Sequence, residues 1–475
     1  MYRKVLPALL RPLDRIRSLE TPRVLRVLAW LQAIERAVPV SRRVRRFLRD
    51  QKPDVVFVSP LVDAASDQVD TVRAARAAGI PVIGGIASWD NLTNKGLMRV
   101  EPDLVTVWNG YQKAEAVELH GIAADRVVVT GAQLFDRWFD RTTGTSRAEF
   151  CRMVGLPDDR PFVLFTGSSV FIARSEHEVP FVRRWIEQLR ASADPTLRDA
   201  AVLIRPHPFN PEAWITADFS DLHPVAIWPR RRYTPAAEEA RSSLFDSLVH
   251  CHAVVGINTS AMIEAAILGK PVLSIASPEF AGTQDGTIHF RYLRQENGGC
   301  VRVAASIDEH LGQLAAVLRD PALVRAETER FVASFVRPNG LTTACTPILA
   351  DVIAHAGWKG SAPAREAGTS RALRVLVWPV AVATWVWAIL ERAWTIAPDP
   401  AAGAADAPRT VFEKGGRILR VASHRVRRVA SRLVLLTARG VRRVPRMLLR
   451  NARHARYYVA TVVLQRAGKN GSDRA

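Results

Sequence analysis

The sequence predicts an α/β protein in which two lobes, each a parallel sheet flanked by helices, enclose a cleft and precede a basic helical tail. Two observations predict this class. Short apolar runs such as 55–58 and 162–165 alternate with helical stretches at the spacing of parallel α/β units. Residues 253–275 hold one complete unit, in which an apolar strand, a helix and a second apolar strand follow one another directly.

Shifts in composition divide the chain into seven segments. The two lobes are expected at 51–145 and 146–356, and the second lobe includes a closing helix. The other segments are basic, apolar or linker-like, and in chain order they are a basic helical segment at 1–50, a linker at 357–371, a Trp-rich apolar helix at 372–396, a linker at 397–410 and a basic amphipathic tail at 411–475.

Positive charge is concentrated at the two ends of the chain. The formal net charge is +20, residues 1–50 contribute +9, residues 409–475 contribute +16, and the middle is slightly acidic. Basic ends predict contact with an anionic surface. In the tail, apolar residues form one helical stripe with arginines off it, which favours anionic lipid over nucleic acid because aromatic residues are sparse there.

The Trp-rich helix has an uncharged run at 375–390, which is shorter than the roughly 20 apolar residues of a membrane-spanning helix. Insertion into the membrane interface is the first interpretation. A true span and a helix that packs on the body are the alternatives. The N-terminal segment does not have the pattern of a signal peptide. We therefore expect a peripheral or monotopic protein on the cytoplasmic face of the inner membrane.

Cysteine and histidine spacing predicts neither a metal site nor a disulfide framework. The four cysteines lie far apart and the 11 histidines show no zinc-binding spacing. The sequence therefore predicts a reducing compartment, no metal and no bound cofactor.

The start of the helix in 253–275 is the strongest candidate binding site. Asn258, Thr259 and Ser260 precede an apolar helix, and a helix start offers unpaired N–H groups that suit a phosphate. Glu264 lies four residues after Ser260 and shares its face, where a carboxylate can accept from ribose hydroxyls. An ordinary capped helix with Glu264 at its solvent edge is the alternative.

Two further strand ends of the second lobe carry polar residues. Ser168 and Ser169 follow the strand at 162–165, in a small loop whose N–H groups can approach a phosphate. Arg205 and His207 follow the strand at 202–204, where the planar guanidinium suits a phosphate and the imidazole suits a phosphate or a sugar. A tight turn and a structural histidine are the alternatives.

The first lobe has its own polar loop after the strand at 81–86. Asp90 is the candidate general base and, with His207 of the second lobe, a candidate catalytic residue. Asn91 and Lys95 are candidate contacts to the acceptor or to an anion. Ordinary turn chemistry, with a tryptophan that simply packs, is the alternative.

Four stretches carry a resemblance to a known superfamily. They are 253–275, RPHP at 205–208, SWDNLTNKG at 88–96 and RPNG at 337–340. Together they resemble the GT-B-fold nucleotide-sugar enzymes, which include surface-polysaccharide glycosyltransferases, UDP-N-acetylglucosamine 2-epimerases and CDP-glycerol glycerophosphotransferase-like proteins. The resemblance covers roughly 51–355.

The resemblance implies two Rossmann-like lobes and a last helix that crosses back toward the first lobe. It also implies that Thr259 and Ser260 bind the donor diphosphate and that Glu264 binds the ribose. Two departures stand out, because no opening strand with a glycine-rich loop precedes Val55, and Asn339 replaces an expected histidine.

We therefore expect a membrane-associated, metal-independent glycosyltransferase that uses a UDP- or CDP-linked sugar and a lipid-linked or polysaccharide acceptor. Nucleic acid is not an expected partner. A CDP-polyol phosphotransferase and a non-catalytic, membrane-docked scaffold of the same fold are the alternatives.

Overall fold

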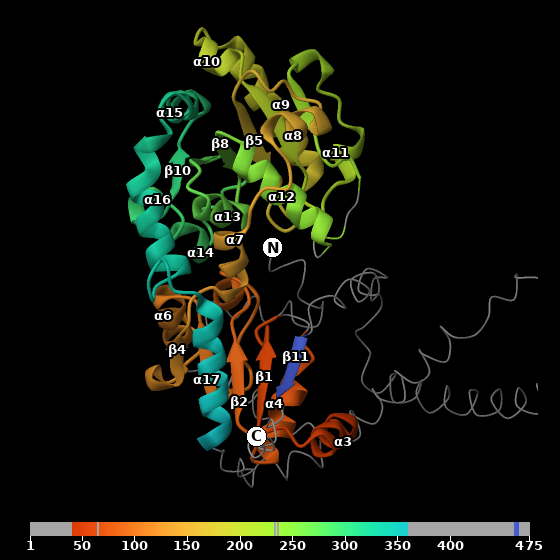
Figure 1. The fold of residues 1–475 in the computed structure, drawn as a ribbon, viewed down its shortest axis with the longest axis vertical. Helices are drawn as coiled ribbons and strands as arrows, with labels where there is room; N and C mark the ends of the chain where they lie inside the picture. The colour runs from red at the N-terminus through yellow and green to blue at the C-terminus, as the bar shows by residue number, and fades with distance from the viewer. Residues whose placement is uncertain (1–39, 64–65, 232–233, 235–236, 360–459, 465–475) are drawn as a thin grey trace, which may run out of the picture. The chain divides into compact units, whose positions relative to one another are not determined.

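The structure of the protein is a computed structural model that describes residues 40–63, 66–231, 234, 237–359 and 460–464 (Figure 1). The elements named below all belong to one compact unit. The expectations for 1–39, for the linkers beyond residue 359 and for the Trp-rich helix at 372–396 lie outside these residues. So does the tail at 411–475, apart from one strand. Within the described ranges, every helix is too short or too polar to span a bilayer.

The first sheet has the strand order β11-β1-β2-β3-β4. Four strands are parallel, and β11 (Ala460–Leu464) pairs antiparallel with β1. The parallel strands are β1 (Val55–Ser59), β2 (Val82–Gly85), β3 (Leu104–Val107) and β4 (Val127–Val129). The helices of this lobe are α3 (Arg42–Gln51), α4 (Gln68–Ala77), α5 (Asn91–Asn94), α6 (Gly110–Glu118) and α7 (Asp136–Asp140).

The strands β1 and β2 are buried along nearly their whole length. Val56, Val58 and Ile83 are completely buried, as continuous apolar runs in parallel sheets normally are. Gly85 is needed beside them, since a Cβ there would lie 2.3 Å from the ring of Phe57. The expected strands at 55–58 and 81–86 are found within one residue of their predicted bounds.

The second sheet has six parallel strands in the order β10-β9-β8-β5-β6-β7. Their bounds are β5 (Phe162–Thr166), β6 (Ala201–Arg205), β7 (Val225–Ile227), β8 (Ala253–Gly256), β9 (Val272–Ile275) and β10 (Val301–Ala304). The sequence analysis did not predict β7 or β10, which are only three and four residues long.

The helices of the second lobe cover both faces of this sheet. They are α8 (Arg147–Val154), α9 (Ser175–Ala191), α10 (Pro195–Arg198), α11 (Glu212–Thr216), α12 (Glu238–His250), α13 (Ala261–Ile267), α14 (Ile288–Arg291), α15 (Ile307–Arg319) and α16 (Arg325–Phe331). Along β5, Phe162 and Leu164 enter one apolar cluster, whereas Val163 and Phe165 enter another. This alternation is what a sheet with two covered faces requires. The predicted α/β fold with two Rossmann-like lobes is therefore confirmed.

The last described helix, α17 (Cys345–Lys359), returns to the first lobe (Figure 1). Leu349, Ile353 and Ala356 join a cluster with Val55 and Phe57 of β1. The expected crossing helix is thus present, and it supplies part of the core of the first sheet.

The RPNG stretch makes a structural joint at the start of this crossing. Arg337 is 5% exposed, and its guanidinium lies 3.4 Å from the centre of the Phe139 ring and 3.2 Å from the carboxylate of Asp136. Asp136 also accepts hydrogen bonds from the N–H groups of Cys345 and Thr346, at 3.0 and 2.7 Å. These are the first two residues of α17, so the carboxylate of Asp136 caps the start of that helix.

Candidate functional site

The second sheet has a topological switch point between β5 and β8. From β5 the chain moves outward through β6 and β7, then returns to β8 on the other side and moves outward through β9 and β10. In parallel α/β sheets, ligands bind outside the carboxyl ends of the strands at such a point. The candidate donor residues lie at the carboxyl ends of β5, β6 and β8 or just beyond them, and Glu264 lies within α13.

Helix α13 begins where expected but is not capped as expected. The Ser260 side chain makes no capping hydrogen bond, and its backbone is already helical with a φ of −61°. Ser260 is exposed and Thr259 is half-buried. Asn258 is buried, and its amide donates to the carbonyl of Thr283 at 2.6 Å, so it fastens the next loop instead of facing a ligand. Ser260 therefore has the most available hydroxyl of this loop.

Glu264 and Arg205 are electrostatic neighbours at the same switch point. Burial raises the pKa of Glu264 to about 7, and the positive charge of Arg205 opposes that rise. The carboxyl group therefore changes protonation near neutral pH. Glu264 is half-buried instead of standing at the solvent edge.

The structure gives Arg205 a different task from the phosphate contact expected from the sequence. Its side chain is 4% exposed and donates to α12. The acceptors are the hydroxyls of Ser243 and Ser247, at 3.0 and 3.1 Å, and the carbonyls of Ser243 and Ala240. The planar guanidinium thus holds α12 against the end of β6, which the sequence did not reveal because α12 lies some 35 to 42 residues away.

The loop after β5 also uses its donors internally. The N–H of Gly167 donates to the Arg205 carbonyl at 2.9 Å, because β5 and β6 continue to pair one step beyond the strand. The N–H of Ser168 donates to Glu178 at 2.8 Å, and the Ser168 side chain is completely buried. Ser169 is half-buried. The expected phosphate cradle of N–H groups is therefore occupied at Gly167 and Ser168.

Glu178 is a buried carboxyl that the sequence analysis missed. Burial raises its pKa to about 8, and its bonds with Ser168 and with the indole N–H of Trp214 oppose the rise. The signal was present in the sequence. Within α9, Glu178 falls on the apolar side with Phe181, Val182 and Trp185, where a carboxylate needs a specific partner.

His207 is held as a neutral imidazole. Burial lowers its pKa to about 4, and its Nδ1 accepts the N–H of Phe209 at 3.2 Å. A neutral ring with Nδ1 as acceptor carries its proton on Nε2, which suits hydrogen bonding to an oxygen but not pairing with a phosphate as a cation.

In the first lobe, Asp90 lies within a set of charged and polar partners. Its carboxylate accepts from the Ser88 hydroxyl at 2.6 Å and lies 3.1 Å from the ammonium of Lys95. Burial by itself raises the pKa of Asp90, but Lys95 and Ser88 outweigh burial and hold the pKa below its usual value. An ionised, paired carboxylate of this kind is a weak base, and Lys95 has an internal partner.

Asn91 has a structural task instead of the expected acceptor contact. It is 3% exposed, and its side-chain oxygen accepts the N–H groups of Ala87 and Ser88, at 3.0 and 2.7 Å. Its amide donates to the carbonyl of Val62. Asn91 therefore shapes the loop that carries Asp90.

His289 of the second lobe reaches the Asp90 loop, and the sequence analysis did not single it out. Its Nδ1 lies 2.9 Å from the hydroxyl of Thr93, and its ring meets Trp89 edge-on at 4.8 Å between centroids. Nearby, Tyr111 of α6 stacks on Tyr292 at 4.6 Å. The two lobes therefore touch at the carboxyl ends of both sheets.

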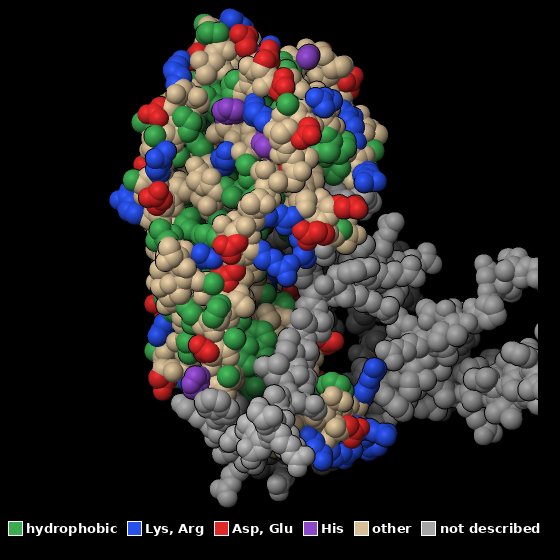
Figure 2. Space-filling view, viewed as in Figure 1, with side chains coloured by type: hydrophobic (Ala, Val, Ile, Leu, Met, Phe, Trp, Pro, Cys, Tyr) green, Lys and Arg blue, Asp and Glu red, His purple; other side chains and the backbone are tan. Residues whose placement is uncertain are grey.

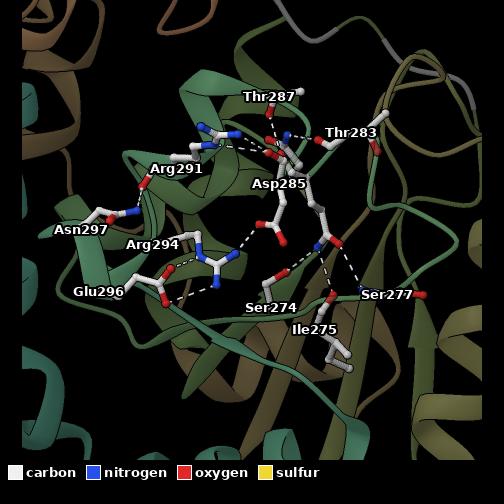
Figure 3. Close-up of polar contacts among 12 residues, drawn as sticks. Ser274, Ile275, Ser277, Thr283, Asp285, Thr287, Arg291, Arg294, Glu296 and Asn297 are labelled. Carbon is white, nitrogen blue, oxygen red and sulfur yellow. Dashed lines mark hydrogen bonds and ion pairs between the residues drawn. The ribbon is translucent and has the colours of Figure 1, made fainter.

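The loop between β9 and α14 is fixed by a dense set of hydrogen bonds (Figure 3). The amide of Gln284 donates to the Ser274 hydroxyl and to the carbonyls of Ile275 and Ile257, at 3.0 to 3.2 Å. The guanidinium of Arg294 pairs with Asp285. This loop therefore positions α14 firmly instead of closing over a ligand as a lid.

In the parts of the chain that the structure describes, no three His, Cys, Asp or Glu side chains are grouped so that they could hold a metal ion. The four cysteines are free thiols and all are buried.

Comparisons with known proteins find structural similarity only. No family model and no curated protein matches the chain. The wall teichoic acid polymerase TagF is similar at 13% identity and a TM-score of 0.36, over 54% of this chain and 59% of that one. This chain thus spans about three fifths of the TagF chain that it matches.

Two UDP-GlcNAc 2-epimerases are also similar. The enzyme from Neisseria meningitidis, bound to UDP-GlcNAc, shows 19% identity and a TM-score of 0.44, over 66% of this chain and 79% of that one. The enzyme from Methanocaldococcus jannaschii shows 15% identity and a TM-score of 0.42, with the same coverage. The strand orders of the two sheets, and not these similarities, establish the fold.

Proposed function

We propose that this protein is a membrane-associated, metal-independent glycosyltransferase that transfers a sugar from a UDP- or CDP-linked donor to a hydroxyl group of a lipid-linked or polysaccharide acceptor. One observation carries the proposal. Polar side chains stand at the switch point of the second sheet, and His289 joins that lobe to the Asp90 loop at the carboxyl ends of the first sheet. A donor site and an acceptor site on adjoining lobes suit a group transfer.

The donor would bind beside β5 and β8. The exposed hydroxyl of Ser260 is available to the diphosphate, and Glu264 is placed one turn on to accept from ribose hydroxyls. His207, neutral and with Nε2 as a donor, suits a phosphate or sugar oxygen. Hydrogen-bond donors that are already in place stabilise the leaving diphosphate without a metal ion.

The basic helix α3 supports an anionic membrane as the place of action. Five arginines of α3 are exposed, and Phe47 among them is 48% exposed, while Leu48 is buried against the lobe (Figure 2). The arginines are Arg42, Arg43, Arg45, Arg46 and Arg49. Interleaved arginine and an exposed aromatic ring suit a bilayer interface with anionic headgroups. We propose the cytoplasmic face of the inner membrane as the site.

A non-catalytic scaffold of the same fold is the second candidate, and one observation favours it. The N–H groups of Gly167 and Ser168 and the guanidinium of Arg205 are all engaged within the protein. A scaffold of this kind would bind no donor, or bind it without turnover. A CDP-polyol phosphotransferase differs from the first candidate in the transferred group, which is a polyol phosphate instead of a sugar.

Thermal unfolding of the full chain with UDP, CDP, UDP-GlcNAc and CDP-glycerol tests these candidates. We expect UDP compounds to raise Tm, and Ser260→Ala or Glu264→Gln to abolish the shift. The matched control is Glu329→Gln, on an exposed residue of α16. A shift confined to CDP compounds would establish the polyol alternative, and no shift with any compound in the folded protein would establish the scaffold.

Vesicle sedimentation tests the membrane. Replacing Arg42, Arg45 and Arg46 by Gln should weaken binding to phosphatidylglycerol vesicles and leave phosphatidylcholine vesicles unchanged. The control replaces three exposed arginines of the second lobe, Arg152, Arg174 and Arg330. Equal binding of all three proteins would show that α3 does not contact the membrane.

A further inference from the structure

His289 stands where the two lobes meet, beside the loop that carries Asp90. It is 2% exposed and belongs to α14 of the second lobe, whereas Trp89 and Thr93 belong to the first. Its ring meets the Trp89 ring edge-on, at 4.8 Å between centroids, and its Nδ1 lies 2.9 Å from the hydroxyl of Thr93. The ring therefore has a single defined orientation.

The hydroxyl of Thr93 fixes the position of the imidazole proton. This hydroxyl has one hydrogen, which it donates to the carbonyl of Asp90 at 3.4 Å. It can make both of its recorded contacts only if it accepts from Nδ1–H of His289. The proton of the neutral ring is then on Nδ1, and Nε2 keeps its lone pair.

Nε2 of His289 has no hydrogen-bond partner among the described residues, and it is not completely enclosed by other atoms. His310 provides the contrast, because both of its ring nitrogens are completely enclosed and without a partner. Of the two neutral imidazoles at the strand ends, His207 carries its proton on Nε2 and His289 carries it on Nδ1. Only His289 therefore presents a free lone pair on Nε2.

The groups around His289 keep its imidazole neutral and place a carboxylate near it. Burial lowers its pKa to about 4, the carboxylate of Asp90 opposes that fall, and Lys95 adds to it. Glu115 of α6 stands near Asp90, and burial raises the pKa of Glu115 to about 7. When His289 takes up a proton, the ionised Asp90 stabilises the resulting imidazolium, as the carboxylate does in an acid–histidine pair.

The support of His289 is rigid. Arg291, on the same helix, donates to the Asp285 carbonyl at 3.2 and 3.3 Å, and Arg294 pairs with the Asp285 carboxylate (Figure 3). Gln284 anchors the preceding residues to the ends of β8 and β9. A catalytic group accelerates a reaction more when the surrounding elements hold it in the reactive orientation before the substrate binds.

We propose that His289 is the catalytic base that takes the proton from the acceptor hydroxyl, with Asp90 stabilising the charge that forms. This inference rests on the proposed transferase function. It assigns Asp90 the stabilising role instead of the role of base. The catalytic pair then consists of one residue from each lobe.

The step balances as a direct displacement. The acceptor oxygen forms a bond to the sugar carbon that carries the diphosphate, and the bond from that carbon to the diphosphate oxygen breaks. The electron pair of the broken bond leaves with the diphosphate, and the hydroxyl proton moves to Nε2 of His289. The configuration at the sugar carbon is inverted.

The test uses the full chain with UDP-GlcNAc as the donor and water as the acceptor, so that the leaving nucleoside diphosphate is UDP. We expect His289→Asn to keep the Tm shift and to slow release of the nucleoside diphosphate by about 10²–10⁴-fold. His177→Asn, on an exposed position of α9, is the control and should retain the full rate.

Chemical rescue separates catalysis from structure. In His289→Ala, added imidazole should restore part of the rate and bring back its rise with pH, which a merely structural histidine would not allow. Thr93→Val should lower the rate less than either histidine variant and leave the Tm shift intact. Full turnover in His289→Asn, or a loss in His289→Ala that imidazole does not relieve, overturns the inference. No Tm shift in the wild type instead overturns the proposed function.

Discussion

Polar groups at the strand ends of the two sheets are paired in different ways. At the second sheet, backbone N–H groups and Arg205 are satisfied by neighbouring elements, while Ser260 stays exposed and Glu264 is half-buried. At the first sheet, charged groups pair with one another, as Asp90 does with Lys95. The hydrogen bonds at the second sheet hold neighbouring elements rigidly in place. The ion pair at the first sheet keeps charged side chains at the proposed site of reaction. Polar residues at a strand end therefore do not reveal from their type alone which of the two tasks they perform.

The largest effect is expected where support is removed from the second sheet. Arg205→Ala leaves the hydroxyls of Ser243 and Ser247 without a donor and should lower the free energy of unfolding by about 3 kcal/mol. Urea denaturation measures it, with Arg152→Ala on an exposed position as control. A variant that keeps wild-type stability and loses only nucleotide binding would show that the guanidinium serves a ligand after all.

A second effect should appear in the pH dependence of stability. The folded protein raises the pKa of Glu178 from its ordinary value of 4.5 to about 8. The neutral form is therefore favoured by folding, and stability is lost as pH rises between these two values, at up to about 1.4 kcal/mol per pH unit. Glu178→Gln removes this loss.

Denaturation at pH 5, 6, 7 and 8 checks the Glu178 prediction. As pH rises, the unfolding free energy of Glu178→Gln should increase relative to that of the wild type. Glu176→Gln, exposed on the same helix, should follow the wild type. Parallel curves for the wild type and Glu178→Gln would mean that Glu178 is ionised throughout.

The smallest effect on stability is expected at Ser260. An N-cap serine usually contributes about 1 kcal/mol, but the Ser260 side chain makes no capping bond, so Ser260→Ala should change stability by less than about 0.5 kcal/mol. Ser146→Ala is the matched comparison, because Ser146 forms a complete capping box with Glu149. A large loss at Ser260 would place this residue with the supporting groups of the second sheet.

Much of the fold follows from local sequence. The strand at 55–58 and the strand–helix–strand unit at 253–275 are predicted correctly, because apolar runs act over a few residues. The strands β7 and β10 are missed because three or four residues give too little pattern.

The candidate site is less accessible to sequence reasoning. The loops are found, because strand ends are visible in the sequence, but the partners of each side chain are not. Arg205 meets Ser247, which is 42 residues away, and Thr93 meets His289, which is 196 residues away. These pairings arise from the order of strands and from the meeting of two lobes, and no spacing along the chain encodes them.

The return of α17 to the first sheet has a consequence for synthesis of the chain. The apolar face of β1 is covered by Leu349, Ile353 and Ala356, which emerge from the ribosome about 300 residues after β1 itself. Domains usually fold in order as they are made. Here the lobe that is translated first can complete its core only after the second lobe has been translated, so a nascent chain that stops before Cys345 exposes an apolar sheet to chaperones and to aggregation.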